Sequence, residues 1–330
     1  MTAYTGIQGQ NILIVSSDPA NPTEGQIWYN STSNLLKGYA NVVTNAWASG
    51  GNLASTRNAL GGAGTQTVGL AFGGNTPGGV TASTEEYDGT SWSGGGNMGT
   101  ARYVISGTGV QTAALAISGR IPPNTTTTAT EEYDGSTWTA GGTLATGKLS
   151  AGASGTQTAA LNFGGRGTPP PISGITATEE YDGTSWTSGG NLNTARYGIV
   201  GCGTQTSGLG FGGVDTGATL NATEEYDGTS WTSGGNLGTA RYQLAASGLQ
   251  TAALGAGGYS TVFTGVSELY NGTSWTSTGT MNTARSLLGG LGGSGTQTAG
   301  LVFGGSTPTK TNATEEFTGT VVGTRTITTS

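Results

Sequence analysis

The feature that most constrains this sequence is an acidic, aromatic stretch of about ten residues that occurs six times. It reads ATEEYDGSTW at 129–138 and ATEEYDGTSW at both 177–186 and 222–231. A variant, ASTEEYDGTSW, ends at Trp92, and the more divergent VSELYNGTSW (266–275) and ATEEFTGT (313–320) complete the set. A catalytic centre requires one set of groups, so six copies indicate a repeated structural element.

Other residues keep the same period. From Trp47 to Trp275 the tryptophans recur at intervals of 44–48 residues. A basic residue recurs at Arg57, Arg102, Lys148, Arg196, Arg241 and Arg285, and a glutamine at Gln66, Gln111, Gln157, Gln205, Gln250 and Gln297. A period in the forties, built from short strand-like segments, predicts the blades of a β-propeller.

One repeat divides into four expected strands. Within residues 196–233, the segments RYGIVGCG, SGLGFGG, ATEEYDG and TSWTS each suit a strand. The Asp-Gly pair between the last two predicts a tight hairpin turn. No stretch shows a sustained helical period, so the predicted fold class is all-β, a propeller of four-stranded blades.

The number of blades depends on residues 1–50, which are about one repeat long. Residues near Tyr39 and Trp47 resemble the third and fourth strands of a blade, and NILIVSS and GQIWYN would supply the first two. We therefore favour seven blades, the first irregular. The alternative is six blades with a separate N-terminal hairpin. The corresponding domain division places an irregular blade or attachment segment at 1–48 and six regular blades at 49–330.

Composition excludes several functional classes. The 330 residues contain no His and one Cys, Cys202, so a disulfide within the chain and a His-based catalytic triad are excluded. We expect no metal, no cofactor and no enzymatic activity. The net charge of −7 argues against nucleic acid as a partner. No apolar run approaches the roughly 20 residues of a membrane span, and the N-terminus lacks the basic region of a signal peptide.

The repeat resembles the kelch repeat. That pattern has a double glycine, a Glu-x-Tyr-Asp strand, a tryptophan and a later arginine, seen best here in Gly212-Gly213, Glu224, Tyr226-Asp227, Trp231 and Arg241. The resemblance covers about residues 39–317 and implies a β-propeller. It implies no single function, because this fold carries enzymes, scaffolds and adhesins.

A second resemblance concerns the N-terminal stretch DPANPTEGQIWYNSTSNLLKGY (18–39). It is similar to a short module of tailed-phage virion proteins that often begins a fibre or appendage subunit. This similarity implies a virion protein that is assembled in the host cytoplasm and is extracellular after lysis. A β-repeat composition rich in Gly, Thr, Ser and Asn agrees with a particle that exists outside cells.

The repeated charged residues are expected to have a structural role. The first glutamate of each copy (Glu85, Glu131, Glu179, Glu224, Glu268 and Glu315) shares a strand face with the tyrosine. We interpret it as the partner of the repeated arginine or lysine, which holds strand to strand or blade to blade. Such a pair matters only when it is partly buried, since exposed pairs contribute about 0–1 kcal/mol. The rival interpretation is a ring of cation sites.

Two other classes of protein are compatible with parts of the sequence. DGTSW resembles the Asp-box of sialidases, but Asp88 and Gly89 are adjacent here, whereas that motif separates them. No cluster of three arginines is evident, so a glycan-active propeller enzyme is the weaker hypothesis. A secreted or cell-surface bacterial adhesin is the other alternative.

The expected recognition residues lie in the variable loops between the second and third strands. Residues that break the repeat there are Arg120, Arg166, Asp215, Tyr259 and Lys310. Loops on a rigid scaffold commonly carry recognition. The leading prediction is therefore a non-enzymatic phage virion protein (a tail fibre, an appendage or a capsid decoration). Its partners would be other virion proteins and a host-surface glycan or protein, and a homo-oligomer is compatible with this role.

Overall fold

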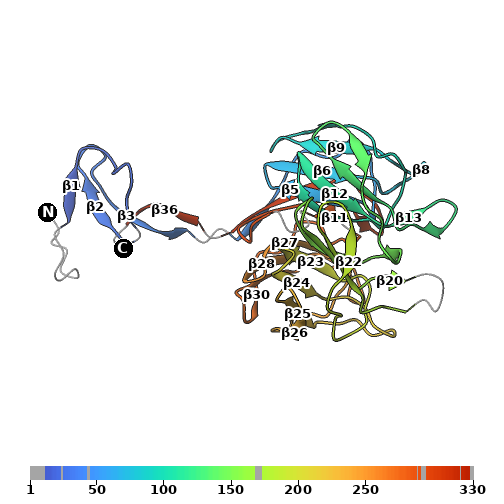
Figure 1. Ribbon diagram of the computed structural model, residues 1–330. Helices are drawn as coiled ribbons and strands as arrows, with labels where there is room; N and C mark the ends of the chain where they lie inside the picture. Colours follow the sequence, from blue (N-terminus) through green and yellow to red (C-terminus); the bar gives the residue numbers. More distant parts are fainter. Residues whose placement is uncertain are drawn as a thin grey trace. The chain divides into compact units, whose positions relative to one another are not determined.

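A computed structural model describes residues 12–23, 25–42, 45–167, 173–287, 289–290, 295–319 and 321–327 (Figure 1). The described residues form strands, turns and loops, without a helix among them. The chain divides into two compact units. The small unit comprises Met1–Asn45 with Gly319–Ser330, and the large unit is Ala46–Thr318. The expected all-β class is confirmed.

The small unit contains one four-stranded sheet in the order β1-β2-β3-β36. Its strands are β1 (Leu13–Val15), β2 (Ile27–Asn30), β3 (Leu35–Val42) and β36 (Val321–Thr326). β1 pairs with β2 in parallel, while the other pairings are antiparallel. Residues from both ends of the chain therefore share this sheet.

The large unit contains six four-stranded antiparallel sheets. In order from the innermost strand outward, the first three are β5 (Gly61–Thr65), β6 (Val68–Phe72), β9 (Thr84–Tyr87) and β10 (Trp92–Gly94); β11 (Ser106–Val110), β12 (Ala113–Ile117), β15 (Thr130–Tyr133) and β16 (Trp138–Ala140); and β18 (Gly152–Gly155), β19 (Ala160–Phe163), β21 (Thr178–Tyr181) and β22 (Trp186–Ser188). The remaining three are β23 (Val200–Gly203), β24 (Gly208–Phe211), β25 (Thr223–Tyr226) and β26 (Trp231–Ser233); β27 (Ala245–Leu249), β28 (Ala252–Ala256), β29 (Ser267–Tyr270) and β30 (Trp275–Ser277); and β31 (Gly289–Gly290), β32 (Ala299–Phe303), β35 (Thr314–Thr318) and β4 (Ala46–Ser49).

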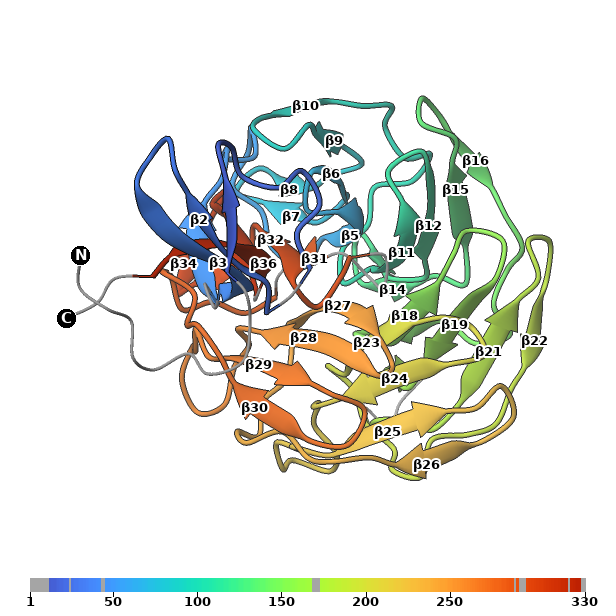
Figure 2. The ribbon, with the colours of Figure 1, turned by 90° about the vertical axis from the view of Figure 1, so that its left-hand side faces the viewer.

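The six sheets follow one another around a common centre (Figure 2). Each innermost strand contacts the innermost strands before and after it, in the order β5, β11, β18, β23, β27 and β31, and β31 contacts β5. This arrangement is compatible with a β-propeller.

The N-terminal segments are placed differently from our expectation. The strand that contains Trp47, β4, pairs with β35, so that Trp47 lies opposite Phe317. The strand that contains Tyr39, β3, belongs to the sheet of the small unit. The expected pairing of these two segments within one irregular blade is therefore wrong, because β35, far away in sequence, supplies the partner of β4. A seventh blade is not confirmed.

The repeated decapeptide forms the outer hairpin of the first five sheets. In the first sheet, Tyr87 lies opposite Trp92 across the β9–β10 pair. The Asp88 carboxylate accepts hydrogen bonds from the backbone N–H groups of Thr90 and Ser91, and Gly89 has a φ of 90°. A side-chain acceptor followed by a residue that tolerates positive φ is the chemistry that this turn requires.

Glycines in the innermost strands make room for aromatic rings. A Cβ on Gly61 would lie 2.2 Å from the Phe72 ring, and one on Gly107, in the next sheet, would lie 2.6 Å from it. Phe72 in turn packs at 5.0 Å, between ring centroids, from Trp138 of the second sheet. Small residues near the axis therefore let large rings fill the space between sheets, where burial of apolar area is the main stabilising term.

Repeated hydrogen bonds also join each sheet to the one before it. Each indole N–H donates to a hydroxyl of the preceding sheet at 2.9–3.1 Å, and Trp92 of the first sheet donates to Thr314 of the sixth. Each repeated glutamine donates to two backbone carbonyls of the preceding sheet at 2.5–3.3 Å. Gln66 makes these bonds to the sixth sheet, so the first and last sheets are joined like the others.

Candidate functional site

The repeated basic residue and the first glutamate form an ion pair within every sheet of the large unit. The nitrogen–oxygen distances are 2.7–3.1 Å in the pairs Arg57–Glu85, Arg102–Glu131, Lys148–Glu179, Arg196–Glu224, Arg241–Glu268 and Arg285–Glu315. The basic side chains are at most 1% exposed. Burial lowers the pKa of Arg241 to about 10, opposed by the nearby Glu268, so the guanidinium stays protonated at neutral pH.

The same basic residue ties the base of the variable loop together. Arg196 donates from Nη1 to the carbonyls of Gly212 and Ala222, which lie at the two ends of the loop, and from Nη2 to Glu224. The second oxygen of Glu224 accepts the backbone N–H of Asn193 in the connection between sheets. This network satisfies both buried charges and holds the loop ends at a set separation, an aspect that sequence analysis did not foresee.

The second glutamate of each copy has a separate role that the sequence analysis missed. Its carboxylate accepts a hydrogen bond of 2.5–2.6 Å from the tyrosine hydroxyl of the next sheet, in the pairs Tyr133–Glu86, Tyr181–Glu132, Tyr226–Glu180, Tyr270–Glu225 and Tyr87–Glu316. A glycine packs against each of these pairs. A Cβ on Gly141, for example, would lie 2.9 Å from the Tyr181 hydroxyl.

The boundary between the fifth and sixth sheets departs from this rule in three coordinated positions. Leu269 replaces the glutamate, Phe317 replaces the tyrosine, and Thr278 replaces the glycine. Leu269 packs against the apolar cluster that contains Phe317 and Trp47. The donor, the acceptor and the close glycine are therefore lost together, so neither member of the hydrogen-bonded pair is left without its partner.

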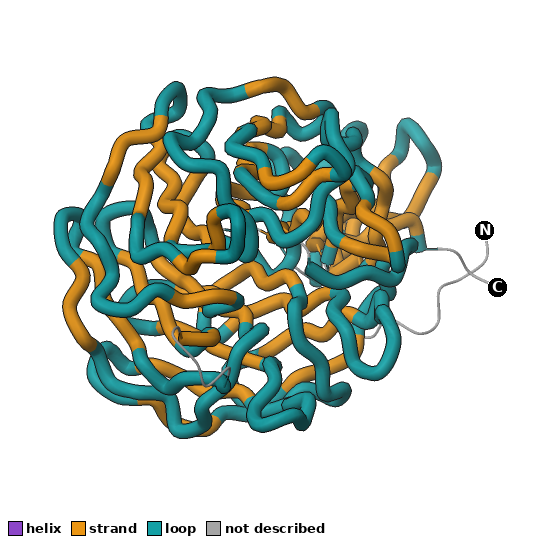
Figure 3. The backbone as a smooth tube through the Cα atoms, turned by 90° about the vertical axis from the view of Figure 1, so that its right-hand side faces the viewer, coloured by secondary structure: helices purple, strands orange, loops and turns teal. Residues whose placement is uncertain are grey.

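The variable loops begin with short strands that lie on one side of the large unit. β8 (Gly79–Val80), β13 (Arg120–Ile121) and β20 (Arg166–Gly167) mark that side in Figure 1, and Figure 3 looks onto it. Their partners and the remaining short strands are β7 (Asn75–Thr76), β14 (Thr125–Thr126), β17 (Lys148–Leu149), β33 (Ser306–Thr307) and β34 (Thr309–Lys310). We call this side the loop face.

The predicted recognition residues occupy different places on the loop face. Arg120 and Arg166 begin the loops of the second and third sheets, and Tyr259 begins that of the fifth. Asp215 caps a turn by accepting the N–H of Ala218. Lys310 donates to a carbonyl across the boundary between the sixth and first sheets, that of Thr76, at 2.6 Å. The five residues thus do not converge on one point.

An aromatic row on the loop face connects two of these residues. The Arg166 guanidinium lies 4.2 Å from the centre of the Tyr197 ring. Tyr242 lies 5.7 Å from Tyr259, and Tyr259 lies 5.3 Å from Phe263, between ring centres. Tyr242 also packs against Gly198, the residue after Tyr197, since a Cβ there would lie 3.2 Å from the Tyr242 ring. Burial, followed by the neighbouring Tyr259 and Tyr197, raises the pKa of Tyr242. We call Arg166, these three tyrosines and Phe263 the aromatic row.

The aromatic row occupies only part of the loop face. In each sheet, the residue that follows the repeated basic residue pairs with the start of the variable loop. From the first sheet to the sixth, these residues are Asn58, Tyr103, Leu149, Tyr197, Tyr242 and Ser286. The loop positions opposite are Asn75, Arg120, Arg166, Val214, Tyr259 and Ser306. Equivalent positions are therefore bulky in the second to fifth sheets and small and polar in the first and sixth.

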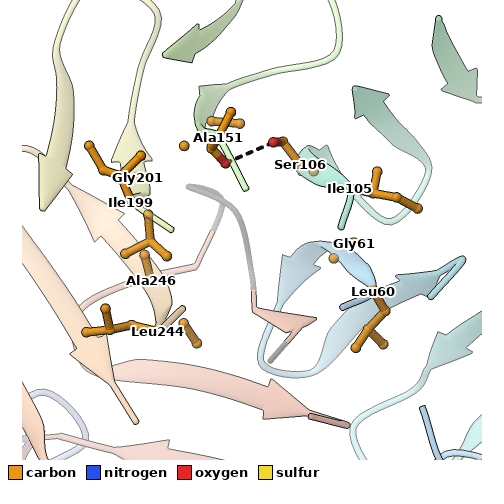
Figure 4. A pocket seen from close by; sticks show the side chains of 15 residues that line it. Leu60, Gly61, Ile105, Ser106, Ala151, Ile199, Gly201, Leu244 and Ala246 are labelled. Carbon is orange, nitrogen blue, oxygen red and sulfur yellow. Dashed lines mark hydrogen bonds between the residues drawn. The ribbon is translucent and has the colours of Figure 1, made fainter. Parts of the chain in front are cut away.

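A small cavity of about 90 Å³ lies at the centre of the sheets (Figure 4). Its lining combines backbone of the innermost strands with apolar side chains such as Leu60, Ile199 and Leu244. Ser106 donates its hydroxyl to the carbonyl of Ala151. These groups offer neither a nucleophile with a base nor a charged ligand for a metal. The described lining residues therefore point to no catalytic or metal chemistry in this cavity.

The small unit contains one polar cluster, within the stretch 18–39. The Asp18 carboxylate accepts hydrogen bonds from the Trp28 indole and the Asn30 amide and pairs with Lys37 at 2.6 Å. The hydrogen bonds from Lys37, Asn30 and Trp28 lower the pKa of Asp18 to about 2. Four residues of this stretch therefore act together to hold β2 and β3 against the preceding loop.

The described residues contain no cluster of three or more His, Cys, Asp or Glu side chains that could hold a metal ion. Cys202 is buried, and burial raises the pKa of its thiol. None of the described segments is a helix long and apolar enough to span a membrane. No protein-family model matches the chain, and no curated protein matches it.

Proposed function

We propose that this chain is a non-enzymatic structural and adhesion protein of a tailed-phage virion. In this proposal the large unit is a kelch-like β-propeller of six closed blades that presents its loop face to a host surface. The small unit joins the protein to the particle. The protein is a tail fibre, an appendage or a capsid decoration.

The observation that carries the proposal is the contrast between the repeated and unrepeated parts of the large unit. The ion pairs, the tyrosine–glutamate bonds and the glutamine bonds recur around the ring and serve packing. Residues that differ between sheets gather on the loop face, where the basic residues hold the loop ends. A rigid ring with one variable face is suited to recognition.

The small unit supports the attachment role by its separate construction. It has its own sheet, and the stretch that resembles phage virion modules is organised around Asp18. Both ends of the large unit, at Ala46 and Thr318, continue into this unit. Two covalent connections to the small unit suit a propeller that is attached to a particle through that unit.

Two measurements test the proposal. Particles purified from a culture that produces this chain are examined by mass spectrometry and immunogold labelling, and the chain is expected on the tail or capsid. Fluorescently labelled chain is then added to host cells, with a variant shortened at 120–126 as the comparison. The proposal predicts that the full chain binds and that the shortened but folded variant binds less. Absence from particles would refute the virion assignment, and equal binding by both chains would refute the role of this loop.

A further inference from the structure

The loop face carries charges that the fold does not use. In the described part of the large unit, Arg120, Arg166 and Lys310 are the basic residues that form no ion pair. The Nε atoms of Arg120 and Arg166 are buried and have no hydrogen-bond partner among the described residues, whereas Lys310 donates to Thr76. Asp215, the acidic residue of the neighbouring loop, binds its own turn rather than Arg166. Among the described residues, these two planar cations therefore have no ionic partner.

The aromatic row sets the kind of anion that fits. Stacking on Tyr197 holds the Arg166 guanidinium, and the fork of N–H groups on a guanidinium matches a carboxylate. Beside it, Tyr242, Tyr259 and Phe263 offer apolar ring faces, and the tyrosines add hydroxyls. A ligand suited to this surface has flat apolar faces, many hydroxyls and periodic carboxylates.

From these features we infer that the aromatic row binds an acidic polysaccharide, one whose sugar units carry carboxylates. This inference deepens the proposed function and rests on it for the biological setting. The sugar rings would lie along the tyrosines while a carboxylate meets Arg166. An acidic peptide fits less well, because peptide anchors are commonly buried in pockets, and no residue of the row lines the central cavity or the two other hollows found on the described residues, beside Val104 and beside Pro308.

The test is affinity electrophoresis of the full chain in gels containing polygalacturonate, alginate or polysialic acid. Carboxyl-reduced polygalacturonate and polyglutamate serve as matched controls for the charge and for the sugar. Retardation by at least one acidic polysaccharide, with at least tenfold weaker retardation by both controls, is the expected result. Failure of all three acidic polysaccharides, or equal binding to either control, overturns the inference.

Variants locate the site. Arg166→Ala and Tyr242→Ala are each expected to weaken binding about tenfold or more, since a charged hydrogen bond or a stacked ring is lost. Arg166→Lys is expected to recover only part of the affinity, because lysine lacks the planar fork. Asn58→Ala and Ser286→Ala, at positions equivalent to Tyr242, are expected to bind within twofold of the parent chain. Denaturation midpoints confirm that each variant is folded.

The outcomes separate the two proposals. If the two row variants keep the parent affinity while folded, the site assignment is wrong even though the glycan binds. If the chain binds host cells but no acidic polysaccharide, the ligand class is wrong and the adhesion function stands. If the chain binds the polysaccharide but is absent from particles, the virion assignment fails and the binding site stands.

Discussion

The hydrogen bond between Tyr181 and Glu132 offers a quantitative test of how neighbouring sheets are joined. The two oxygens lie 2.5 Å apart, and the Tyr181 side chain is fully buried. A hydrogen bond to a charged group contributes about 1.5–3 kcal/mol to stability. Tyr181→Phe removes the donor and Glu132→Leu removes the acceptor, so each variant alone is expected to lose about this amount of unfolding free energy. The double variant loses the same bond once and reproduces the arrangement of Phe317 and Leu269.

The double-mutant cycle should therefore yield a coupling energy of about 1.5–3 kcal/mol between the two positions. Equilibrium unfolding in urea, followed by tryptophan fluorescence, measures the four free energies. The matched control combines Tyr181→Phe with Glu316→Leu, since Glu316 bonds to Tyr87 at another boundary. Those two changes should be additive within about 0.5 kcal/mol. A coupling in the contacting pair that is no larger than in the control would refute the reasoning.

A third change extends the test to the adjacent glycine. Because a Cβ at Gly141 would lie 2.9 Å from the Tyr181 hydroxyl, Gly141→Thr should be poorly tolerated in the parent chain. In the Tyr181→Phe, Glu132→Leu background the same change should cost less, as Thr278 beside Phe317 and Leu269 indicates. An equal cost in both backgrounds would show that the three substitutions at the fifth boundary are unrelated.

Three further predictions follow from the charged groups. Burial and then the bond to a glutamate raise the pKa of five tyrosines to about 12, above the value of about 10 in the unfolded chain; these are Tyr87, Tyr133, Tyr181, Tyr226 and Tyr270. The stability that they contribute below pH 10 should therefore be lost as the pH rises through 12. Unfolding midpoints from pH 9 to 12 measure this loss, and a flat profile would contradict it. Arg196→Ala leaves Glu224 buried without its partner and should lower the free energy of unfolding by about 3–5 kcal/mol. The control, Arg120→Ala, breaks no ion pair and should change the urea midpoint little. Similar shifts of the midpoint in both variants would argue against a stabilising buried pair. Asp18→Asn removes a carboxylate whose pKa is lowered to about 2 by Lys37, Asn30 and Trp28. Hydrogen exchange of the backbone amides should therefore accelerate in β2 and stay unchanged in the large unit. Unaltered exchange in β2 would show that this cluster does not stabilise the sheet.

The repeated parts of the fold were accessible from sequence because their signals are local and periodic. Strand length, the Asp-Gly turn and the spacing of Trp47 and its equivalents all lie within one repeat. The nearness of Arg196 and Glu224 followed from the recurrence of both residues in register. The pairing of β4 with β35 was not accessible, since it joins Trp47 to Phe317 across most of the chain and leaves no local pattern.

The candidate site was only partly accessible for a related reason. Arg166 was recognised because it breaks the repeat within a variable loop. Tyr197 and Tyr242 were overlooked, although each directly follows a repeated arginine at a position that differs from sheet to sheet. The sequence also contained a signal for the altered boundary between the fifth and sixth sheets, because Leu269 and Phe317 both depart from an otherwise regular pattern. The two departures could be linked only with the knowledge that the second glutamate of one sheet contacts the tyrosine of the next.

The origin of the outer strand of the sixth sheet has a consequence for how such genes can change length. Because β4 precedes the first sheet in the chain, the gene segment that repeats begins with an outer strand and ends with the third strand of the following sheet. Recombination that adds or removes one whole segment leaves the pairing of β4 with β35 intact and alters only the angle between sheets. A crossover between Leu269 and Phe317 is the exception. At the new boundary between sheets, it would place a glutamate against a phenylalanine, or a leucine against a tyrosine, and so leave one polar group without its partner. A change in copy number should therefore be tolerated best at breakpoints outside that interval.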